Sequence, residues 1–170
     1  MGDNGVLYSS FDNDFPKEMA KLCKNVDYIL PNLTEASYLL GIPYVGENYD
    51  KKYIEKISRD LIKLGCKNVI ITCISFEKEN LGASVYKNES DIFEYYFTEK
   101  IDVFFHGTGD IFSSVFTGAI LRGKTPLQKV TLAAEFVVDS IKKTLDDLEN
   151  HWYGVKFERA IPGLIKALEL

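Results

Sequence analysis

The chain has 170 residues, of which 46% are hydrophobic and 26% charged, and its formal net charge at pH 7 is −5. This balance is typical of an ordinary globular protein, and the length suits one hydrophobic core, so we expect a single domain over residues 1–170. The basic residues are dispersed, which argues against a nucleic acid partner. The apolar runs are too short for a membrane span and no secretory leader is recognisable, so we expect a cytoplasmic protein without a membrane partner.

Hydrophobic periodicity and turn residues divide the chain into alternating helices and strands. In the first half we expect a turn at residues 1–5, a short apolar piece at 6–8, a helix ending near residue 23, a strand at 26–30, and helices at 32–41 and 49–64. In the second half we expect a strand at 68–74, a hairpin near 82–86 and 92–97, and helices at 107–122 and 125–141. This alternation predicts an α/β domain with a mainly parallel sheet, the hairpin lying on one side of it.

Two polar stretches follow expected strands, and in α/β folds ligands gather at the carboxyl ends of strands. Residues 32–35 come after the strand at 26–30, and residues 72–75 end the strand at 68–74. Asn32 or Thr34 can cap the helix that begins there, with Glu35 favourable in its first turn. We therefore expect both stretches near a ligand.

The cysteines and histidines show no metal-ligand spacing. Cys23, Cys66 and Cys73 each lie in an apolar run, and we expect buried free thiols. His106 adjoins a glycine loop and is expected to shape that loop or meet a phosphate, whereas His151 is expected to be structural.

The glycine loop reads His-Gly-Thr-Gly-Asp from residue 106 and leads into apolar residues at helical spacing. Gly107 and Gly109 let backbone N–H groups approach a ligand closely, and the start of a helix leaves such groups without internal partners. With the helix dipole this predicts a phosphate site, beside which Asp110 is an acid–base group. Such a pair suits transfer of a phosphoryl group to a hydroxyl whose proton Asp110 accepts. The alternative is a plain loop whose aspartate caps the helix.

Four segments together resemble the pyridoxal/pyridoxamine kinase family of the ribokinase-like superfamily. They are Met1-Gly2-Asp3-Asn4-Gly5 with Tyr8, Leu30-Pro31-Asn32-Leu33-Thr34-Glu35-Ala36, Val69-Ile70-Ile71-Thr72, and His106-Gly107-Thr108-Gly109-Asp110-Ile111-Phe112. Their order and spacing fit from residue 1 to about residue 145. The resemblance implies a three-layer α/β/α sandwich and ATP-dependent phosphorylation of the 5′-hydroxymethyl group of a B6 vitamer, which is pyridoxal, pyridoxamine or pyridoxine.

The resemblance implies roles for the residues of the glycine loop. Asp110 would be the catalytic base and touch the substrate, and Gly107, Thr108 and Gly109 would form the anion hole. Tyr8 would approach the vitamer. No Walker-type Gly-Lys-Ser/Thr loop is present to bind the phosphates in another way.

It also implies a nucleotide and metal site. Asn32 and Thr72 would contact the ATP phosphates, and Glu35 and Asp3 would act on Mg²⁺ and the nucleotide. Thr72 would also lie near a monovalent cation, K⁺ or Na⁺, although family members often carry Thr where this chain has Leu30. From the residues alone, Glu35 could be an ordinary first-turn carboxylate and Thr72 a strand threonine bonded to backbone.

In the family the Gly-Asp turn lies mid-chain, after a portion that supplies the first strands, much of the vitamin pocket and a lid. We therefore expect a fold incomplete at its N-terminal side, corresponding to the C-terminal, ATP-binding and catalytic part of such a kinase. The sheet would then have an uncovered edge, and we expect a homodimer or a partner chain to cover it.

Other functions stay open at this point. A hydroxymethylpyrimidine kinase of the same superfamily is the nearest rival, although such enzymes typically have Cys where this chain has Asp110. Sugar kinases of the superfamily more often have Ala at the position of Thr108. The alternative from another class is a non-catalytic nucleotide-binding fragment.

Overall fold

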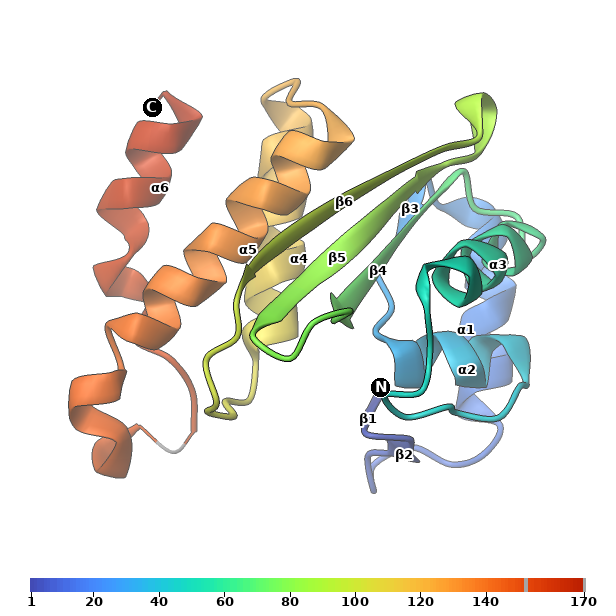
Figure 1. Cartoon of the computed structure of the whole chain (residues 1–170), viewed down its shortest axis with the longest axis horizontal. Helices are drawn as coiled ribbons and strands as arrows, with labels where there is room; N and C mark the ends of the chain where they lie inside the picture. Colours follow the sequence, from blue (N-terminus) through green and yellow to red (C-terminus); the bar gives the residue numbers. More distant parts are fainter. Residues whose placement is uncertain (152, 170) are drawn as a thin grey trace. The chain divides into compact units, whose positions relative to one another are not determined.

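The computed structural model describes residues 1–151 and 153–169, which divide into two compact units, Met1–Phe97 and Thr98–Leu170 (Figure 1). The first unit contains the sheet and three α-helices, and the second contains three further α-helices. The single domain expected from the sequence stays a prediction.

The first unit opens with a hairpin of two short antiparallel strands, β1 (Gly2–Asp3) and β2 (Val6–Leu7). Asn4 and Gly5 connect them with φ angles of 47° and 79°. Two consecutive positive φ values are the signature of the tight hairpin turn that Asn-Gly favours. The turn expected at residues 1–5 is therefore confirmed.

Three α-helices follow in this unit, and polar side chains set where two of them begin. The helices are α1 (Phe15–Leu22), extended by a 3-10 turn at Cys23–Asn25, α2 (Leu33–Leu40) and α3 (Lys51–Ile62). Asn32 caps α2, and the carboxylate of Asp50 accepts a hydrogen bond from the backbone N–H of Tyr53 at the start of α3. Gly41 ends α2 in the left-handed conformation, as the glycine there predicted.

The four-stranded sheet has the order β3-β4-β5-β6, formed by β3 (Tyr28–Ile29), β4 (Asn68–Ile74), β5 (Asn80–Lys87) and β6 (Ile92–Glu99). β3 pairs parallel to β4, and β4 pairs antiparallel to β5. β5 and β6 are joined by the short turn Asn88–Ser90, which confirms the hairpin on one side of the sheet. The α/β class is confirmed, and the sheet among the described residues is mixed because the hairpin adds antiparallel pairing to it.

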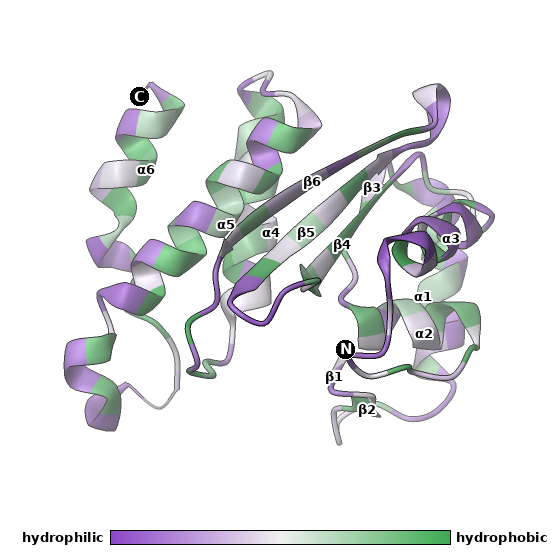
Figure 2. Ribbon diagram, viewed as in Figure 1, coloured by the Kyte–Doolittle hydropathy of each residue, from purple (hydrophilic) through white to green (hydrophobic). Residues whose placement is uncertain are grey.

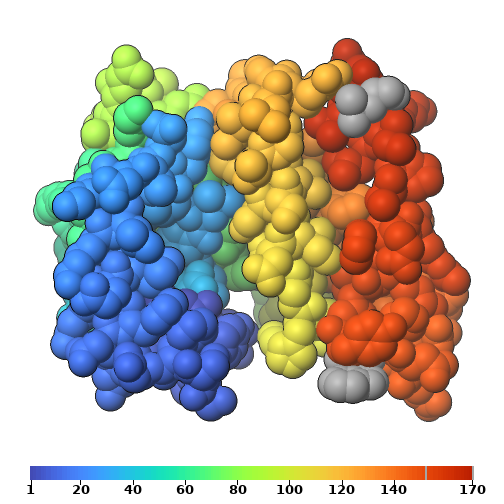
Figure 3. All heavy atoms as spheres, turned by 180° about the vertical axis from the view of Figure 1, so that it is seen from behind, coloured from blue at the N-terminus to red at the C-terminus, as the bar shows by residue number. Residues whose placement is uncertain are grey.

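The core of the first unit lies between the sheet and the helices α2 and α3. It is lined by Leu33, Ala36, Ile54, Ile57, Leu61, Cys66, Val69, Ile71, Ile74 and Tyr86. The apolar run of β4 is green in Figure 2, and α3 carries green and purple on different faces, as an amphipathic helix does. By contrast, α1 buries only Pro16, and Figure 3 shows the blue atoms of this part of the chain at the surface.

The second unit is helical after the end of β6. Its longest helices are α4 (Thr108–Leu121) and α5 (Pro126–Lys142), which pack against each other. Thr125 caps α5 with the same reciprocal arrangement that Asn32 makes at α2. Two 3-10 segments, Leu145–Asn150 and Phe157–Arg159, then lead to α6 (Ile161–Leu168). None of the helices in the described residues is long and apolar enough to cross a membrane.

Candidate active site

The glycine loop before α4 presents bare backbone. Gly107 is the N-cap residue of α4, with φ of 82°, and no side chain caps the helix. A Cβ atom built on Gly107 or Gly109 would meet no atom within 4 Å, so the space in front of the loop is open. Because the first-turn N–H groups of a helix lack internal acceptors, this end of α4 offers donors to an anion. The geometry therefore fits the anion hole expected from the sequence.

Asp110 lies in the first turn of α4, as expected, and is exposed. The cap position belongs to Gly107, so Asp110 does not cap the helix. A hydrogen bond attaches the loop to the buried residue Phe105: Thr108 Oγ1 donates to the Phe105 carbonyl oxygen at 3.4 Å. An exposed carboxylate beside open backbone donors can accept a proton from a hydroxyl brought to the loop.

In the first unit, Asn32 and Glu35 form a capping box at the start of α2. Asn32 Oδ1 accepts from the Glu35 N–H at 2.8 Å, and Glu35 Oε2 accepts from the Asn32 N–H at 3.0 Å. Glu35 Oε1 is 2.7 Å from the α-ammonium of Met1. The Asn32 side chain also donates to the Gly2 carbonyl oxygen at 2.9 Å. One oxygen of Glu35 is thus held by the helix and the other faces a positive charge.

Thr72 lies beside Asn32, as expected for two strand ends of a parallel pair. The two residues form an isolated parallel bridge, and the Thr72 N–H donates to the Pro31 carbonyl oxygen at 2.9 Å. The register of β4 shifts between Thr72 and Ile74, and Cys73 in this bulge has a φ of 57°. Positive φ at a residue with a Cβ stores backbone strain, which is frequent at functional sites.

The prediction that all three cysteines are buried is wrong for Cys73. Cys23 and Cys66 are buried, whereas the bulge leaves Cys73 an exposed surface. Desolvation nevertheless raises the pKa of the Cys73 thiol, and the negative charges of Asp3 and Glu35 raise it further. The hydrogen bonds of Asn32 to Glu35 and to Gly2, which precedes Asp3, together with the bridge from Asn32 to Thr72, place both carboxylates near this end of β4.

The structure thus gathers Asp3, Asn32, Glu35 and Thr72 within the first unit, and Gly107, Thr108, Gly109 and Asp110 within the second. No group of three or more His, Cys, Asp or Glu side chains arranged for a metal occurs in residues 1–151 and 153–169. Mg²⁺ commonly binds through one or two carboxylates and completes its shell with water and substrate phosphates. Asp3 and Glu35 are the carboxylates near Asn32 and Thr72, and both oxygens of Glu35 are paired here, with the Asn32 N–H and the Met1 ammonium. The roles of all these residues stay predictions.

Thr34 and Tyr38 hold the first hairpin on α2; Thr34, expected as a possible cap, does not cap the helix, because Asn32 does. Thr34 Oγ1 accepts from the Gly5 N–H at 2.9 Å, and the Tyr38 hydroxyl donates to the Gly5 carbonyl oxygen at 3.2 Å. The two residues are four apart in the sequence, so both lie on the same face of α2. This spacing is the sequence feature that could have identified them. Tyr8 follows this hairpin directly and is exposed. No glycine or other turn-forming residue beside Cys73 in the sequence of β4 predicts the bulge there.

Comparisons with known proteins cover most of the chain. The model of a family described as phosphomethylpyrimidine kinase matches residues 9–153. A pyridoxal kinase from Dictyostelium discoideum is 29% identical over 166 residues, covering 88% of this chain and 50% of that protein. The chain spans about half the length of the curated relatives it matches.

Solved structures show the same architecture. A Bacteroides thetaiotaomicron protein, provisionally named a phosphomethylpyrimidine kinase and crystallised with pyridoxal, has a TM-score of 0.89 at 30% identity, covering 96% of this chain and 58% of that chain. A Plasmodium falciparum structure with the ligands AMP-PNP and PL has a TM-score of 0.77 at 28% identity, covering 96% and 54%. The resemblance to pyridoxal kinases that the sequence motifs indicated is thereby confirmed.

Proposed function

Because this chain belongs to the phosphomethylpyrimidine kinase family, we propose that it provides the nucleotide-binding and catalytic part of a kinase that phosphorylates the 5′-hydroxymethyl group of a B6 vitamer. The observation that carries the proposal is the open glycine loop at the start of α4, with Asp110 in the first helical turn. This arrangement combines backbone donors for a phosphoryl group with a base for the hydroxyl that attacks it.

The proposed reaction uses few groups of the chain. Asp110 accepts the proton of the hydroxymethyl group, whose oxygen forms the new bond to the γ-phosphorus of ATP. The bond from that phosphorus to the oxygen bridging it to the β-phosphate breaks, and ADP leaves with the electron pair. The N–H groups of Thr108 and Gly109 hold the charge on the transferring phosphoryl group, as donors at a helix start can.

ATP and Mg²⁺ are the proposed cofactors. The Plasmodium falciparum relative was solved with the ATP analogue AMP-PNP, which supports a nucleotide site. Asp3 and Glu35 would hold Mg²⁺, which when bound offsets phosphate charge, and Asn32 and Thr72 would lie along the phosphates. Leu30 stands where the family often has Thr, so any K⁺ or Na⁺ would rely on Thr72 and its backbone.

The vitamer is proposed over the pyrimidine for two reasons. A relative with a pyrimidine kinase name was crystallised with pyridoxal, which supports B6 vitamers as ligands of such proteins. Asp110 stands where hydroxymethylpyrimidine kinases typically have Cys. The family name and a Haemophilus influenzae hydroxymethylpyrimidine/phosphomethylpyrimidine kinase, 29% identical over 149 residues, support the pyrimidine as the second candidate.

A substrate panel tests the proposal. The 170-residue chain is incubated with ATP and Mg²⁺ and with pyridoxal, pyridoxamine, pyridoxine, hydroxymethylpyrimidine or ribose, and ADP release is measured with and without EDTA. ADP formation that depends on Mg²⁺ and on a B6 vitamer is the expected result. Turnover of the pyrimidine or the sugar alone would refute the vitamer, and AMP-PNP binding without turnover would indicate a nucleotide-binding fragment.

The proposed assembly is a homodimer. β3 is an edge strand of the sheet among the described residues, with hydrogen bonds to β4 only. An unpaired edge is a surface on which another chain can add. Light scattering during size exclusion checks the assembly, and a mass near 19.3 kDa at micromolar concentration would refute the dimer.

A further inference from the structure

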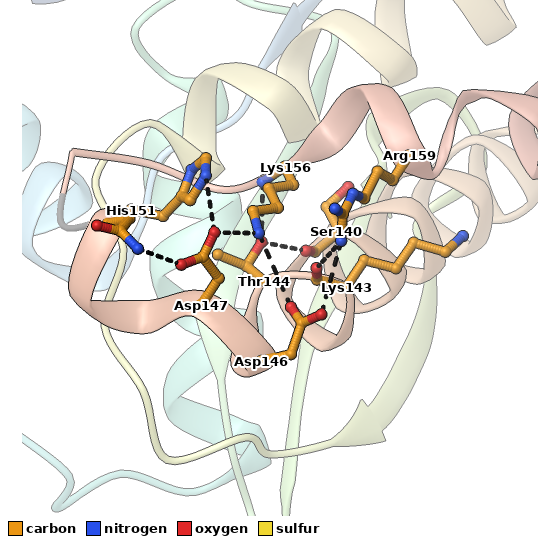
Figure 4. Close-up of polar contacts among 9 residues, drawn as sticks. Ser140, Lys143, Thr144, Asp146, Asp147, His151, Lys156 and Arg159 are labelled. Carbon is orange, nitrogen blue, oxygen red and sulfur yellow. Dashed lines mark hydrogen bonds and ion pairs between the residues drawn. The ribbon is translucent and has the colours of Figure 1, made fainter.

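Lys156 is a lysine with little exposed surface and two acidic neighbours. Its side chain is 7% exposed, and Nζ lies 2.6 Å from Asp147 Oδ2 and 3.8 Å from Asp146 Oδ1 (Figure 4). Asn150 donates to the other oxygen of Asp147 at 2.6 Å, and His151 Nε2 lies 3.6 Å from Asp147 Oδ2. A buried ammonium is costly unless it is paired in a fixed geometry. The ion pair between Lys156 and Asp147 therefore restrains the path of the backbone after residue 150.

The backbone of Lys156 is restrained as well as its side chain. Its N–H donates at 2.8 Å to Thr144 Oγ1, and this hydroxyl donates to the Ser140 carbonyl oxygen at 2.7 Å. Thr144 and Ser140 are fully buried, at and just beyond the end of α5. The two ends of Lys156 thus attach one point of the chain to α5 and to the 3-10 segment that follows it, as Figure 4 shows.

The segment held in this way reaches the glycine loop. Gly154 lies near this loop, since a Cβ atom added to the glycine would be 3.8 Å from the carbonyl oxygen of His106. His106 immediately precedes Gly107, the cap residue of α4. Val155, between Gly154 and Lys156, is buried. All of these residues belong to the second unit, so the path from Lys156 to the glycine loop lies within one compact body.

We propose that Lys156 is a positioning residue for the phosphate-binding loop. By fixing residues 154–156 against α5, it supports the backbone at His106 and so sets the direction of the N–H groups that follow Gly107. The inference rests on the proposed function, because it takes this loop to be the place where the nucleotide phosphates bind. Small displacements of a binding loop weaken binding strongly when several donors must point at one group.

The test compares Lys156→Met with Lys143→Met in the 170-residue chain. Lys156→Met keeps the aliphatic stem and removes the ammonium, whereas Lys143 pairs at 2.6 Å with Asp139 in a more exposed position on the same part of the chain. Asp147→Asn is a second variant with an intact Lys156, and it removes the charge partner from a less buried position. Hydrogen exchange of backbone amides at residues 104–111 and the Kd for AMP-PNP with Mg²⁺ are measured for each.

We expect faster exchange at residues 104–111 and a rise in the AMP-PNP Kd of about 3- to 30-fold in Lys156→Met. Asp147→Asn should change both in the same direction, and Lys143→Met should match the wild type. Faster exchange confined to residues 144–160, with an unchanged Kd, would overturn the inference and leave Lys156 as a stabilising residue only. If Lys156→Met does not fold, Asp147→Asn decides by the same criteria.

The proposed function can fail separately. A wild-type chain that binds no AMP-PNP would refute the nucleotide site. Exchange at residues 104–111 would still decide whether Lys156 holds the loop, because that measurement needs no nucleotide.

Discussion

The side chain of Asn32 donates a 2.9 Å hydrogen bond to the carbonyl oxygen of Gly2, 30 residues earlier in the chain. The same side chain accepts from the Glu35 N–H, so one amide both caps α2 and fastens the first hairpin to it. Asp3, Glu35 and the end of β4 are thereby held in one place. The cap of α2 thus organises the carboxylates proposed to act on the metal.

We expect Asn32→Ala to lower the free energy of unfolding by about 2 kcal/mol, about half from the lost cap and half from the lost bond to Gly2. Thr125→Ala is the matched control, because Thr125 makes the same reciprocal cap at α5 with Gln128 and no bond to the hairpin. Urea denaturation measures both variants. Equal losses would show that the bond to Gly2 contributes nothing.

Asp110→Asn should lower turnover of the B6 vitamer by about 10²- to 10⁴-fold, because an amide cannot take the hydroxyl proton. The Kd for AMP-PNP should stay within about threefold of the wild-type value, since the backbone donors of the glycine loop are unchanged. Asp102→Asn is the control, at an aspartate whose side chain is 90% exposed and which lies outside the loop. Unchanged turnover in Asp110→Asn would remove this residue from the role of base.

Gly107→Ala should cost about 1–2 kcal/mol in unfolding free energy and weaken AMP-PNP binding, because alanine resists the φ of 82° that the loop requires. Gly123→Ala provides a matched strain, with φ of 67° and open space at its Cβ, just beyond the other end of α4. It should lose comparable stability and keep its affinity. An equal loss of affinity in both variants would mean that binding follows stability and not loop geometry.

The three thiols should react at different rates with iodoacetamide in the native protein. Burial raises the pKa of the Cys66 thiol to about 11, and desolvation also raises the pKa values of Cys23 and Cys73. Cys73 alone of the three is exposed, so peptide mass spectrometry should find it modified first, and faster at pH 9 than at pH 7. Denatured protein, with all three modified alike, is the control. First modification at Cys66 would contradict the burial described for it.

Acid should selectively weaken the pair between Asp147 and Lys156. The hydrogen bond from Lys156 lowers the pKa of the Asp147 carboxyl below its ordinary value of 3.8. The unfolded chain therefore binds this proton more readily, so the stabilisation is complete above pH 3.8 and is lost as pH falls through the lower, folded-state pKa. The stability difference between wild type and Asp147→Asn, measured by urea denaturation, should shrink as pH is lowered below that value. A difference independent of pH would contradict the assignment.

Local sequence signals located several elements well. The largely apolar stretch at 68–74 predicted β4 with its observed bounds, and its residues Val69, Ile70, Ile71 and Ile74 are buried, as expected of a strand covered on both faces. Asn32, Glu35 and Gly41 marked the two ends of α2. The strand expected at 26–30 is shorter, since only Tyr28–Ile29 keep regular pairing with β4.

By itself the sequence determined where α2 and α4 begin and that Asp110 lies in the first turn of α4, since each depends on residues within one helical turn, and the structure then assigned the caps to Asn32 and Gly107. Only the tertiary structure decided that Asn32 binds Gly2, that Cys73 in the bulge of β4 is exposed, and that Gly154 lies near His106. These contacts join residues distant along the chain or depend on strand register. Local sequence does not predict long-range contacts or strand register, because both arise only when the helices and strands pack together.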